Sequence, residues 1–245
     1  MGMPISAETP WTVEALWALP DDSLERRELV DGVLHVTPSP SLLHQRVAFE
    51  LGVELRAYCQ TEGIGVVAMA PLDVVLDWRD TVVQPDLLVL PPDVPVHAPR
   101  GLQGVTISLM VEVLSPTSAR TDRLRKRPRY LRAGIPVWLV DPDGWVIEQW
   151  TPGDDQPVVC GDWLTWTPPG ATAPFRLDVA AFFARGVAQD ARVTEGTAVD
   201  VRVEDGRIVL VPLDAEPLEL LLDRITPENR HEVHLADGPI GREAW

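Results

Sequence analysis

The sequence is poor in the features that mark disulfide-rich, metal-cluster or membrane proteins. Its two cysteines, Cys59 and Cys160, are too few for a disulfide framework or a cysteine-based zinc site. We expect both to be small buried apolar residues. No apolar run approaches the roughly eighteen residues of a membrane span. Residues 1–20 lack the basic stretch followed by an apolar run that marks a signal peptide. These absences predict a cytoplasmic protein that does not associate with membranes.

Lysine is almost absent as well. Of 21 basic residues, twenty are arginine and one is lysine, Lys126. In an arginine-biased chain a single lysine can be chance. It can also mark a position where arginine does not serve, because an ammonium is a compact point charge that can hold a water or a phosphate oxygen.

The positive charge is concentrated in one segment of a strongly acidic chain. The net charge is −16, which argues against non-specific nucleic-acid binding because such binding needs clustered cations. Between Arg120 and Arg132, however, seven basic residues stand against one acid, Asp122. This basic run is either a solvated helix face or a local phosphate-binding patch, since charges are screened beyond roughly 8 Å at physiological salt.

The order of helix and strand signals predicts an α/β fold. Asp-Gly pairs at 31–32, 143–144 and 205–206 lie between strand-like segments and predict three hairpins. A helix is expected from a Ser41 cap to about residue 60, ended by Gly63. Runs 65–69, 72–76, 82–90 and 106–114 read as strands, the last one buried on both faces. We expect a mixed central sheet flanked by helices, then a small C-terminal hairpin and an extended tail.

Two acidic residues lie in apolar strands, where a lone carboxylate is costly. Asp86 follows a proline in the run 82–90, and Glu112 lies in the run 106–114. If the strands are adjacent, the two carboxylates share a site and call for a cation between them. Oxygen ligands favour Mg²⁺ or Mn²⁺, and a nearby Lys126 could position a water. The alternative is two structural acids satisfied by helix caps or arginines.

Several short motifs occur in an order that resembles a known nuclease family. Residues from about 25 to 183 resemble the Uma-two family of bacterial endonuclease-like proteins, within the PD-(D/E)XK nuclease superfamily. The matching motifs are Glu28-Leu29-Val30-Asp31-Gly32, Thr37-Pro38-Ser39-Pro40 with His44-Gln45, Val83-Gln84-Pro85-Asp86-Leu87, Val111-Glu112-Val113-Leu114-Ser115-Pro116, and Tyr130-Leu131-Arg132-Ala133-Gly134 followed by Trp138-Leu139-Val140-Asp141-Pro142. The resemblance implies a restriction-endonuclease-like fold and cleavage of nucleic acid.

The resemblance also implies roles for individual residues. Asp86 and Glu112 would bind the divalent metal, together with the backbone carbonyl of Val113. The superfamily's usual lysine position, two residues after the glutamate, is Leu114 here. In the resembled family the lysine comes from the following helix, where Lys126 stands. Pro128, two residues on, is expected to break or kink that helix.

Two residues of the helix expected over 41–60 complete the predicted site. The superfamily takes its first acid from the helix before the sheet, and Glu50 is the candidate because it falls within the arc of an apolar stripe. That stripe is formed by Leu43, Val47, Leu51 and Tyr58. The alternative places Glu50 at the stripe's edge, in water. His44 either contacts phosphate or the attacking water, or makes only a hydrogen bond at the helix start.

The C-terminal segment resembles a different class of protein. Gly206-Arg207-Ile208-Val209-Leu210, the stretch 225–232 and the final Gly238–Trp245 are similar to a MazE-type antitoxin. This resemblance implies a division into a nuclease-like domain, 1–185, and an antitoxin-like segment, 186–245. It names a MazF-type toxin as the partner of the acidic tail, which has few apolar residues of its own.

Two functions of different classes follow from the sequence. The first is a metal-dependent endonuclease, with Mg²⁺ or Mn²⁺ as cofactor and DNA favoured over RNA as substrate. The second is a non-catalytic, antitoxin-like or regulatory protein that acts through residues 186–245. The sequence leaves a homodimer open and shows no element that would read a nucleotide sequence.

Overall fold

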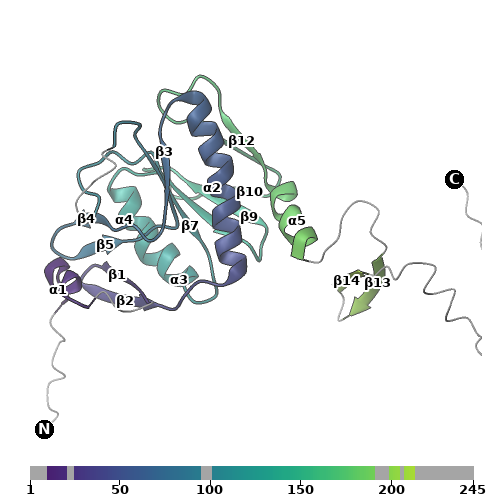
Figure 1. Cartoon of the computed structure of the whole chain (residues 1–245), viewed down its shortest axis with the longest axis horizontal. Coiled ribbons are helices and arrows are strands. Elements are labelled where there is room, and N and C mark those ends of the chain that lie inside the picture. The colour runs from purple at the N-terminus through teal and green to yellow at the C-terminus, as the bar shows by residue number, and fades with distance from the viewer. Residues whose placement is uncertain (1–9, 21–24, 95–100, 191–198, 205–206, 213–245) are drawn as a thin grey trace, which may run out of the picture. The chain divides into compact units, whose positions relative to one another are not determined.

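The computed structural model describes residues 10–20, 25–94, 101–190, 199–204 and 207–212 (Figure 1). The chain divides into two compact units, 1–187 and 188–245. The helical segments are α1 (Val13–Trp17), α2 (Leu42–Glu62), α3 (Ala119–Thr121), the π-helical turn η1 (Asp122–Lys126), α4 (Arg127–Arg132) and α5 (Val179–Asp190). Within the described residues, none of the helices has the length and apolarity to cross a membrane.

The strands of the first unit form a central sheet and two smaller ones. Their bounds are β1 (Arg26–Val30), β2 (Val33–Thr37), β3 (Val66–Met69), β4 (Val74–Asp77), β5 (Thr81–Val83), β6 (Leu87–Leu90), β7 (Leu109–Val113), β8 (Val137–Asp141), β9 (Val146–Trp150), β10 (Val158–Cys160), β11 (Trp163–Trp166) and β12 (Phe175–Asp178). The central sheet has the order β10-β9-β8-β7-β6-β3. In it β7 and β8 pair in parallel and the other neighbours pair antiparallel, so the predicted mixed sheet is confirmed. A second sheet has the order β2-β1-β5-β4, and β11 pairs with β12.

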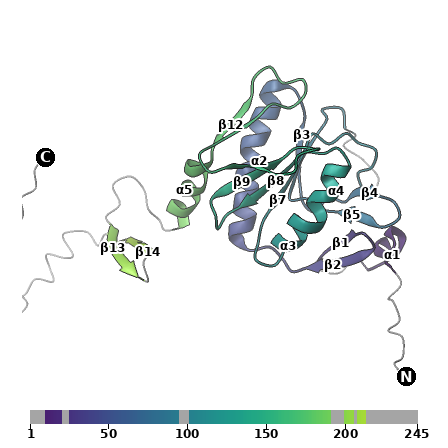
Figure 2. The ribbon, with the colours of Figure 1, turned by 180° about the vertical axis from the view of Figure 1, so that it is seen from behind.

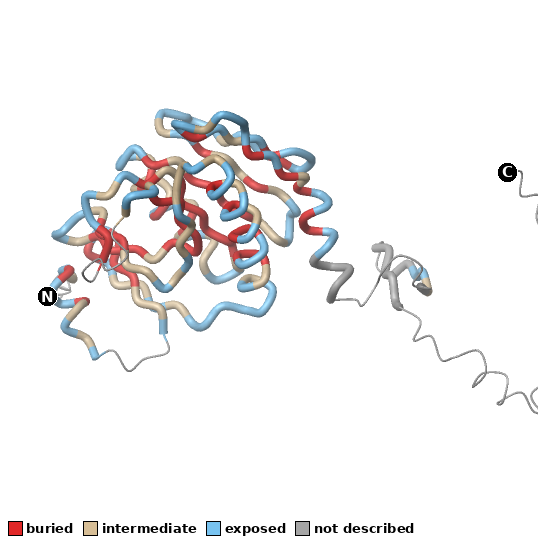
Figure 3. The backbone as a smooth tube through the Cα atoms, turned by 45° about the horizontal axis from the view of Figure 1, so that its top comes forward, coloured by how far each residue is buried: buried red, intermediate tan, exposed pale blue. Residues whose placement is uncertain are grey.

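Helices cover both faces of the central sheet. Figures 1 and 2 show α2 on one face and the segment α3–η1–α4 on the other. Strand side chains alternate between these faces with a period of two. In β7, Leu109, Val111 and Val113 therefore join the core cluster under α2, whereas Met110 joins the cluster under α4. Glu112 has the parity of Met110, so its carboxylate lies on the α4 face. The buried strands run through the middle of this unit (Figure 3).

Helix α2 forms where its capping residues predict it. The Ser41 hydroxyl accepts a hydrogen bond from the His44 N–H, and Gly63 ends the helix in the left-handed conformation at φ 65°. The predicted apolar stripe is correct at Val47 and Leu51 but wrong at Leu43, which is 44% exposed. The buried stripe instead continues through Leu55, Gly52 and Cys59.

The run 82–90, predicted as one strand, is divided between two sheets. Its first part, β5, pairs with β1 and β4, and its second part, β6, pairs with β3 and β7. Gln84-Pro85-Asp86 lies between them, and the proline has no N–H to continue a strand ladder. The break leaves Asp86 at the junction of the two sheets.

The hairpin β1–β2 turns at Asp31-Gly32 as predicted. Both turn residues have positive φ, 54° and 72°, which is the conformation that an Asp-Gly pair favours in a two-residue turn. Along β1 the side chains alternate, so that Leu29 packs in a cluster with α1 and Val30 packs in the cluster under α4. Arg26 and Glu28 share the parity of Val30, so β1 contributes one cation and one acid to that side.

The segment after β7 does not break at Pro128, but a π-helical turn interrupts the α-helix just before this proline. α3, η1 and α4 follow one another directly, and the Arg127 N–H donates to the Asp122 carbonyl, five residues back. Pro128 falls in the first turn of α4, where its missing N–H costs least. The wider turn places Asp122 and Lys126 together on the buried side.

The second unit is described over one hairpin. β13 (Val199–Glu204) pairs antiparallel with β14 (Arg207–Pro212), from Val199 opposite Pro212 to Glu204 opposite Arg207. The hairpin predicted around residues 204–206 is therefore confirmed in its strands. Residues 213–245, which carry most of the antitoxin resemblance, lie outside the described residues.

Candidate active site

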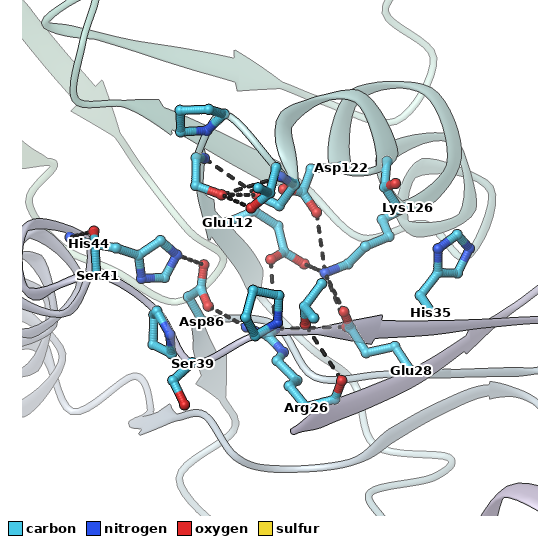
Figure 4. A pocket seen from close by; sticks show the side chains of 18 residues that line it. Arg26, Glu28, His35, Ser39, Ser41, His44, Asp86, Glu112, Asp122 and Lys126 are labelled. Atoms are coloured by element: carbon cyan, nitrogen blue, oxygen red, sulfur yellow. Dashed lines mark hydrogen bonds and ion pairs between the residues drawn. The ribbon is translucent and has the colours of Figure 1, made fainter. Parts of the chain in front are cut away.

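A cluster of buried charged side chains lies on the α4 face of the central sheet. Its acids are Glu28, Asp86, Glu112 and Asp122, and its fully buried cation is Lys126; each is 5% exposed or less. The cluster lines a cavity of about 290 Å³. Figure 4 shows Arg26, His35 and His44 around the same cavity. Four separate segments therefore supply the site: β1–β2, the start of α2, the β6–β7 pair and η1.

Lys126 is the centre of this cluster. Its Nζ lies 2.8 Å from Glu112 Oε1, 3.0 Å from Glu28 Oε1 and 3.3 Å from Asp122 Oδ1. Burial disfavours the ammonium, but the three carboxylates outweigh that effect and raise the pKa of Lys126 above its ordinary value. The side chain is therefore a fixed positive charge rather than a base. The only lysine of the chain lies where the resemblance placed it.

Asp86 is held ionised by the groups around it. Its Oδ2 accepts a hydrogen bond from the Val113 N–H at 2.8 Å and lies 3.2 Å from His44 Nε2, while its Oδ1 accepts from Arg26 at 2.7 Å. Burial by itself would raise the pKa of Asp86, but the His44 hydrogen bond and the Arg26 charge hold it well below its usual range. A buried carboxylate that stays ionised is a ready ligand for a cation.

Glu112 has the opposite environment, although it lies on the neighbouring strand. It accepts a hydrogen bond from the Tyr130 hydroxyl at 2.6 Å and contacts Lys126. Burial is the largest influence, and together with the charges of Asp122 and Asp86 it raises the pKa of Glu112 to about 8 against the attraction of Lys126. The site therefore has more negative groups than its two cations can keep ionised.

Glu28 belongs to the cluster but was not predicted. Its Oε1 accepts the Gln84 N–H at 2.7 Å, and its Oε2 accepts from Lys126 at 3.2 Å. Burial opposes ionisation, yet the charges of Lys126 and Arg26 lower the pKa of Glu28. It could have been found from the sequence, because it is an acid next to Leu29 and Val30 in a predicted strand and opens one of the family motifs.

Glu50 is not in the site, so that prediction is wrong. It is exposed on α2 and does not line the cavity. The buried stripe of α2 passes through Val47 and Leu51, and Glu50 lies beyond its edge. The cavity contains a further carboxylate, Glu28, which lies on β1 rather than on a helix. His44, at the start of α2, does line the cavity.

Most cationic side chains of the basic run 120–132 contact other residues of the protein and are not free to bind phosphate. Arg123 pairs with Glu148 at 2.8 Å and Asp141 at 3.1 Å, Arg127 stacks 3.8 Å from the ring centre of Trp150, and Arg129 pairs with Asp31. Three members of the run remain exposed, namely Arg120, Arg125 and Arg132. Of the arginines that a phosphate-binding patch would use, Arg123 and Arg127 are therefore engaged within the protein, whereas Arg125 stays exposed.

The donors of the site fit a hard divalent cation bound by few protein ligands. Among the described residues, no group of three or more His, Cys, Asp or Glu side chains is arranged to hold a metal ion. Mg²⁺ does not need one, because it keeps several waters and binds through one or two carboxylates plus substrate phosphates. Asp86 and Glu112 offer such oxygens, and the cluster holds more carboxylates than cations. Arg26 pairs with Asp86 at 2.7 Å, and its Nη2 lies 3.9 Å from Glu112 Oε2. Its side chain is 20% exposed, so it could move away from the two carboxylates and leave them to a cation.

Comparisons with known proteins agree with this architecture. The chain resembles the solved structure of a "putative nuclease belonging to DUF820 from Anabaena variabilis ATCC 29413", with a TM-score of 0.59 and 20% identity over 71% of this chain and 98% of that one. This likeness shows a shared fold. No curated protein matches the chain. A family profile described as "Uma2: Putative restriction endonuclease" matches residues 13–179, more than half of the sequence. The chain therefore belongs to the Uma2 (Uma-two) family.

Proposed function

We propose that the protein is a metal-dependent endonuclease that hydrolyses phosphodiester bonds, with DNA as its substrate. The observation that carries the proposal is the buried cluster of Glu28, Asp86, Glu112 and Lys126 in an open cavity. Buried charges at this density are expensive and are typical of catalytic sites. Membership of a family described as restriction endonucleases supports the same reaction class.

In this proposal Asp86, Glu112 and the Val113 carbonyl would hold the metal. A bound Mg²⁺ supplies Lewis-acid stabilisation of negative charge on the phosphate. Asp86 is ionised and fixed by the Val113 N–H, so it needs no rearrangement to act as a ligand. A bound cation would lower the raised pKa of Glu112 and so favour its carboxylate form.

Lys126 and Arg26 act on the phosphate rather than on the metal. The Lys126 ammonium is held by three carboxylates, so it supplies a fixed positive charge beside the reacting phosphate. The Arg26 Nε and Nη2 atoms are buried and make no hydrogen bond. These two donors can bind phosphate oxygens, for which a guanidinium has the right geometry.

The metal site is tested by binding and cleavage together. Mn²⁺ should raise the melting temperature of the protein, because a ligand bound by the native state alone stabilises it. Asp86→Asn should abolish that rise and reduce cleavage of DNA by roughly 10²-fold or more, the scale of removing one electrostatic catalytic group. Glu50→Gln is the matched control, since this exposed acid lies outside the cavity. A metal-induced rise that survives in Asp86→Asn would remove Asp86 from the metal site.

A further inference from the structure

A second hollow adjoins the catalytic cavity and shares part of its wall. It has a volume of about 770 Å³ and lies between the start of α2 and the end of β3. Arg26, Pro40, His44 and Asp86 line both hollows. A substrate whose phosphate reaches Asp86 therefore extends directly into this second space, which we call the α2 groove.

The α2 groove is lined by large apolar side chains that water reaches. Leu42 is 74% exposed, Phe49 is 56% exposed and Met69 is 41% exposed. Pro71 and Ala70 complete the apolar wall. The described part of the chain buries its other phenylalanines, Phe175, Phe182 and Phe183. The exposed ring of Phe49 offers a flat face on which a base can stack.

The charges around the two hollows disfavour a long duplex. Duplex binding gains most of its affinity from many lysine and arginine contacts to phosphates. Here Lys126 is enclosed by carboxylates, and the groove offers Arg26 and Arg46 against Glu25 and Asp86. A duplex also keeps its bases inside, where Phe49 cannot reach their faces. An unpaired strand exposes its bases and needs fewer phosphate contacts.

We propose that the α2 groove binds the bases of an unpaired nucleic-acid strand, with one base stacked on Phe49 while the adjacent phosphate lies against Arg26. This inference rests on the proposed nuclease function and specifies its substrate class as single-stranded or locally unpaired nucleic acid. Met69 and Leu42 cover the remaining faces of the bound bases. His44 lines both hollows and would therefore lie between the bound base and its phosphate.

The test measures binding to the full-length protein without added metal and with EDTA, so that cleavage does not interfere. A fluorescent oligothymidylate and a blunt duplex of the same length are titrated and followed by anisotropy. We expect the single strand to bind more tightly. Phe49→Ala should weaken single-strand binding by roughly 5- to 100-fold, the size of one base–aromatic stacking contact. Phe49→Trp should keep the affinity because it keeps a ring.

Two further variants separate stacking from general apolar contact and from unfolding. Phe49→Leu keeps apolar volume without a ring and should lose most of the same affinity. Leu43→Ala changes another exposed apolar residue of α2 that lines neither hollow, and it should bind like the wild type. A thermal melt of each variant confirms folding.

The outcomes distinguish this inference from the nuclease proposal. Equal or tighter duplex binding, or single-strand binding that Phe49→Ala and Phe49→Leu leave unchanged, overturns the inference even if the protein cleaves DNA. Phe49-dependent binding of single strands supports it, and it does so even if no metal brings about cleavage, which would count against the nuclease proposal alone.

Discussion

At the scale of single residues, the site is a network of opposite charges in which the contribution of each residue to stability depends on its partners. Lys126 contacts Glu28, Glu112 and Asp122, while Arg26 pairs with Asp86. Removing one partner from such a network leaves a buried charge without compensation, which is the costly case for buried ion pairs. The residues proposed to carry the chemistry are therefore also expected to contribute to the stability of this part of the fold.

The first prediction concerns Lys126→Met, which keeps the length of the side chain and removes its charge. We expect the free energy of unfolding to fall by about 3–5 kcal/mol, because three carboxylates lose their shared cation. Urea denaturation measures the change. Arg125→Met is the control: this neighbour is exposed and should alter stability by no more than about 0.5 kcal/mol. A loss below about 1 kcal/mol in Lys126→Met would mean that the cluster tolerates an unpaired acid.

The second prediction concerns Glu62 at the end of α2. Its Oε2 accepts hydrogen bonds from the Thr172 N–H at 2.6 Å, the Thr172 hydroxyl at 2.7 Å and the Ala173 N–H at 3.1 Å. These bonds lower the pKa of Glu62 from its ordinary value of 4.5. The folded state therefore binds this proton less readily than the unfolded state, so the stabilisation is present above pH 4.5 and is lost as the pH falls through the lowered folded-state pKa.

The measurement compares melting temperatures of the wild type and Glu62→Gln across the acidic range. The wild type should melt higher at pH 7, and the difference should shrink as the pH is lowered through and below 4.5. A difference that stays constant down to pH 3 would show that the carboxylate's charge does not contribute.

At the scale of elements, the pairing of strands and the shape of a helix set where the site residues lie. β6 follows Asp86 directly, and it is held in the central sheet by its pairing with β3. Gly65, just before β3, lies close to the Leu90 backbone at the end of β6. On the α4 face of the sheet, the π-helical turn η1 positions two further site residues. It holds Lys126 Nζ 3.3 Å from Asp122 Oδ1. Turns of this kind are frequent at functional sites.

The third prediction contrasts two neighbouring glycines. A Cβ at Gly65 would press on the carbonyl oxygen of Leu90, whereas a Cβ at Gly63 meets nothing within 4 Å and suffers only from the φ of 65°. Gly65→Ala should cost about 1–3 kcal/mol, as overpacking does, and exceed the cost of about 1 kcal/mol at Gly63. Denaturant unfolding of both variants measures the two losses. A larger loss at Gly63 would mean that β3 moves freely relative to β6.

At the scale of the whole molecule, α5 packs into the core of the first unit, residues 1–187. Val179, Phe182 and Phe183 of this helix are buried in the core cluster under α2. Residues beyond the first unit belong to a separate set of contacts. The nuclease-like fold should therefore depend on the start of α5 and not on the chain that follows it.

The fourth prediction follows from this division. A chain that ends after Asp190 should melt near the temperature of the full protein. A chain that ends after Asp178 loses three buried apolar side chains, each worth about 1.5–3 kcal/mol, and should melt much lower or fail to fold. Calorimetry or circular dichroism measures both. An equal melting temperature for the two shortened chains would remove α5 from the core, and a low melting temperature for the longer one would make the C-terminal unit structural.

The sequence by itself determined the elements whose signals are local. The cap at Ser41, the end at Gly63 and the Asp-Gly turn of β1–β2 depend on residues within a few positions of each other, and all three form as predicted. The acids Asp86 and Glu112 were found because a charged residue inside an apolar strand is conspicuous without any knowledge of its partners.

Only the tertiary structure decided which distant segments meet. Glu28 accepts a hydrogen bond from Lys126, which lies 98 residues away in the sequence. The run 82–90 divides between two sheets because its first part pairs with β1 and its second part pairs with β7. Glu50 fell outside the site because the packing of α2, not its average periodicity, sets the edge of the buried stripe. The arginines of the basic run found partners on β9 and in the β1–β2 turn. Such pairings depend on contacts between segments that are far apart in the sequence, so local sequence patterns cannot predict them.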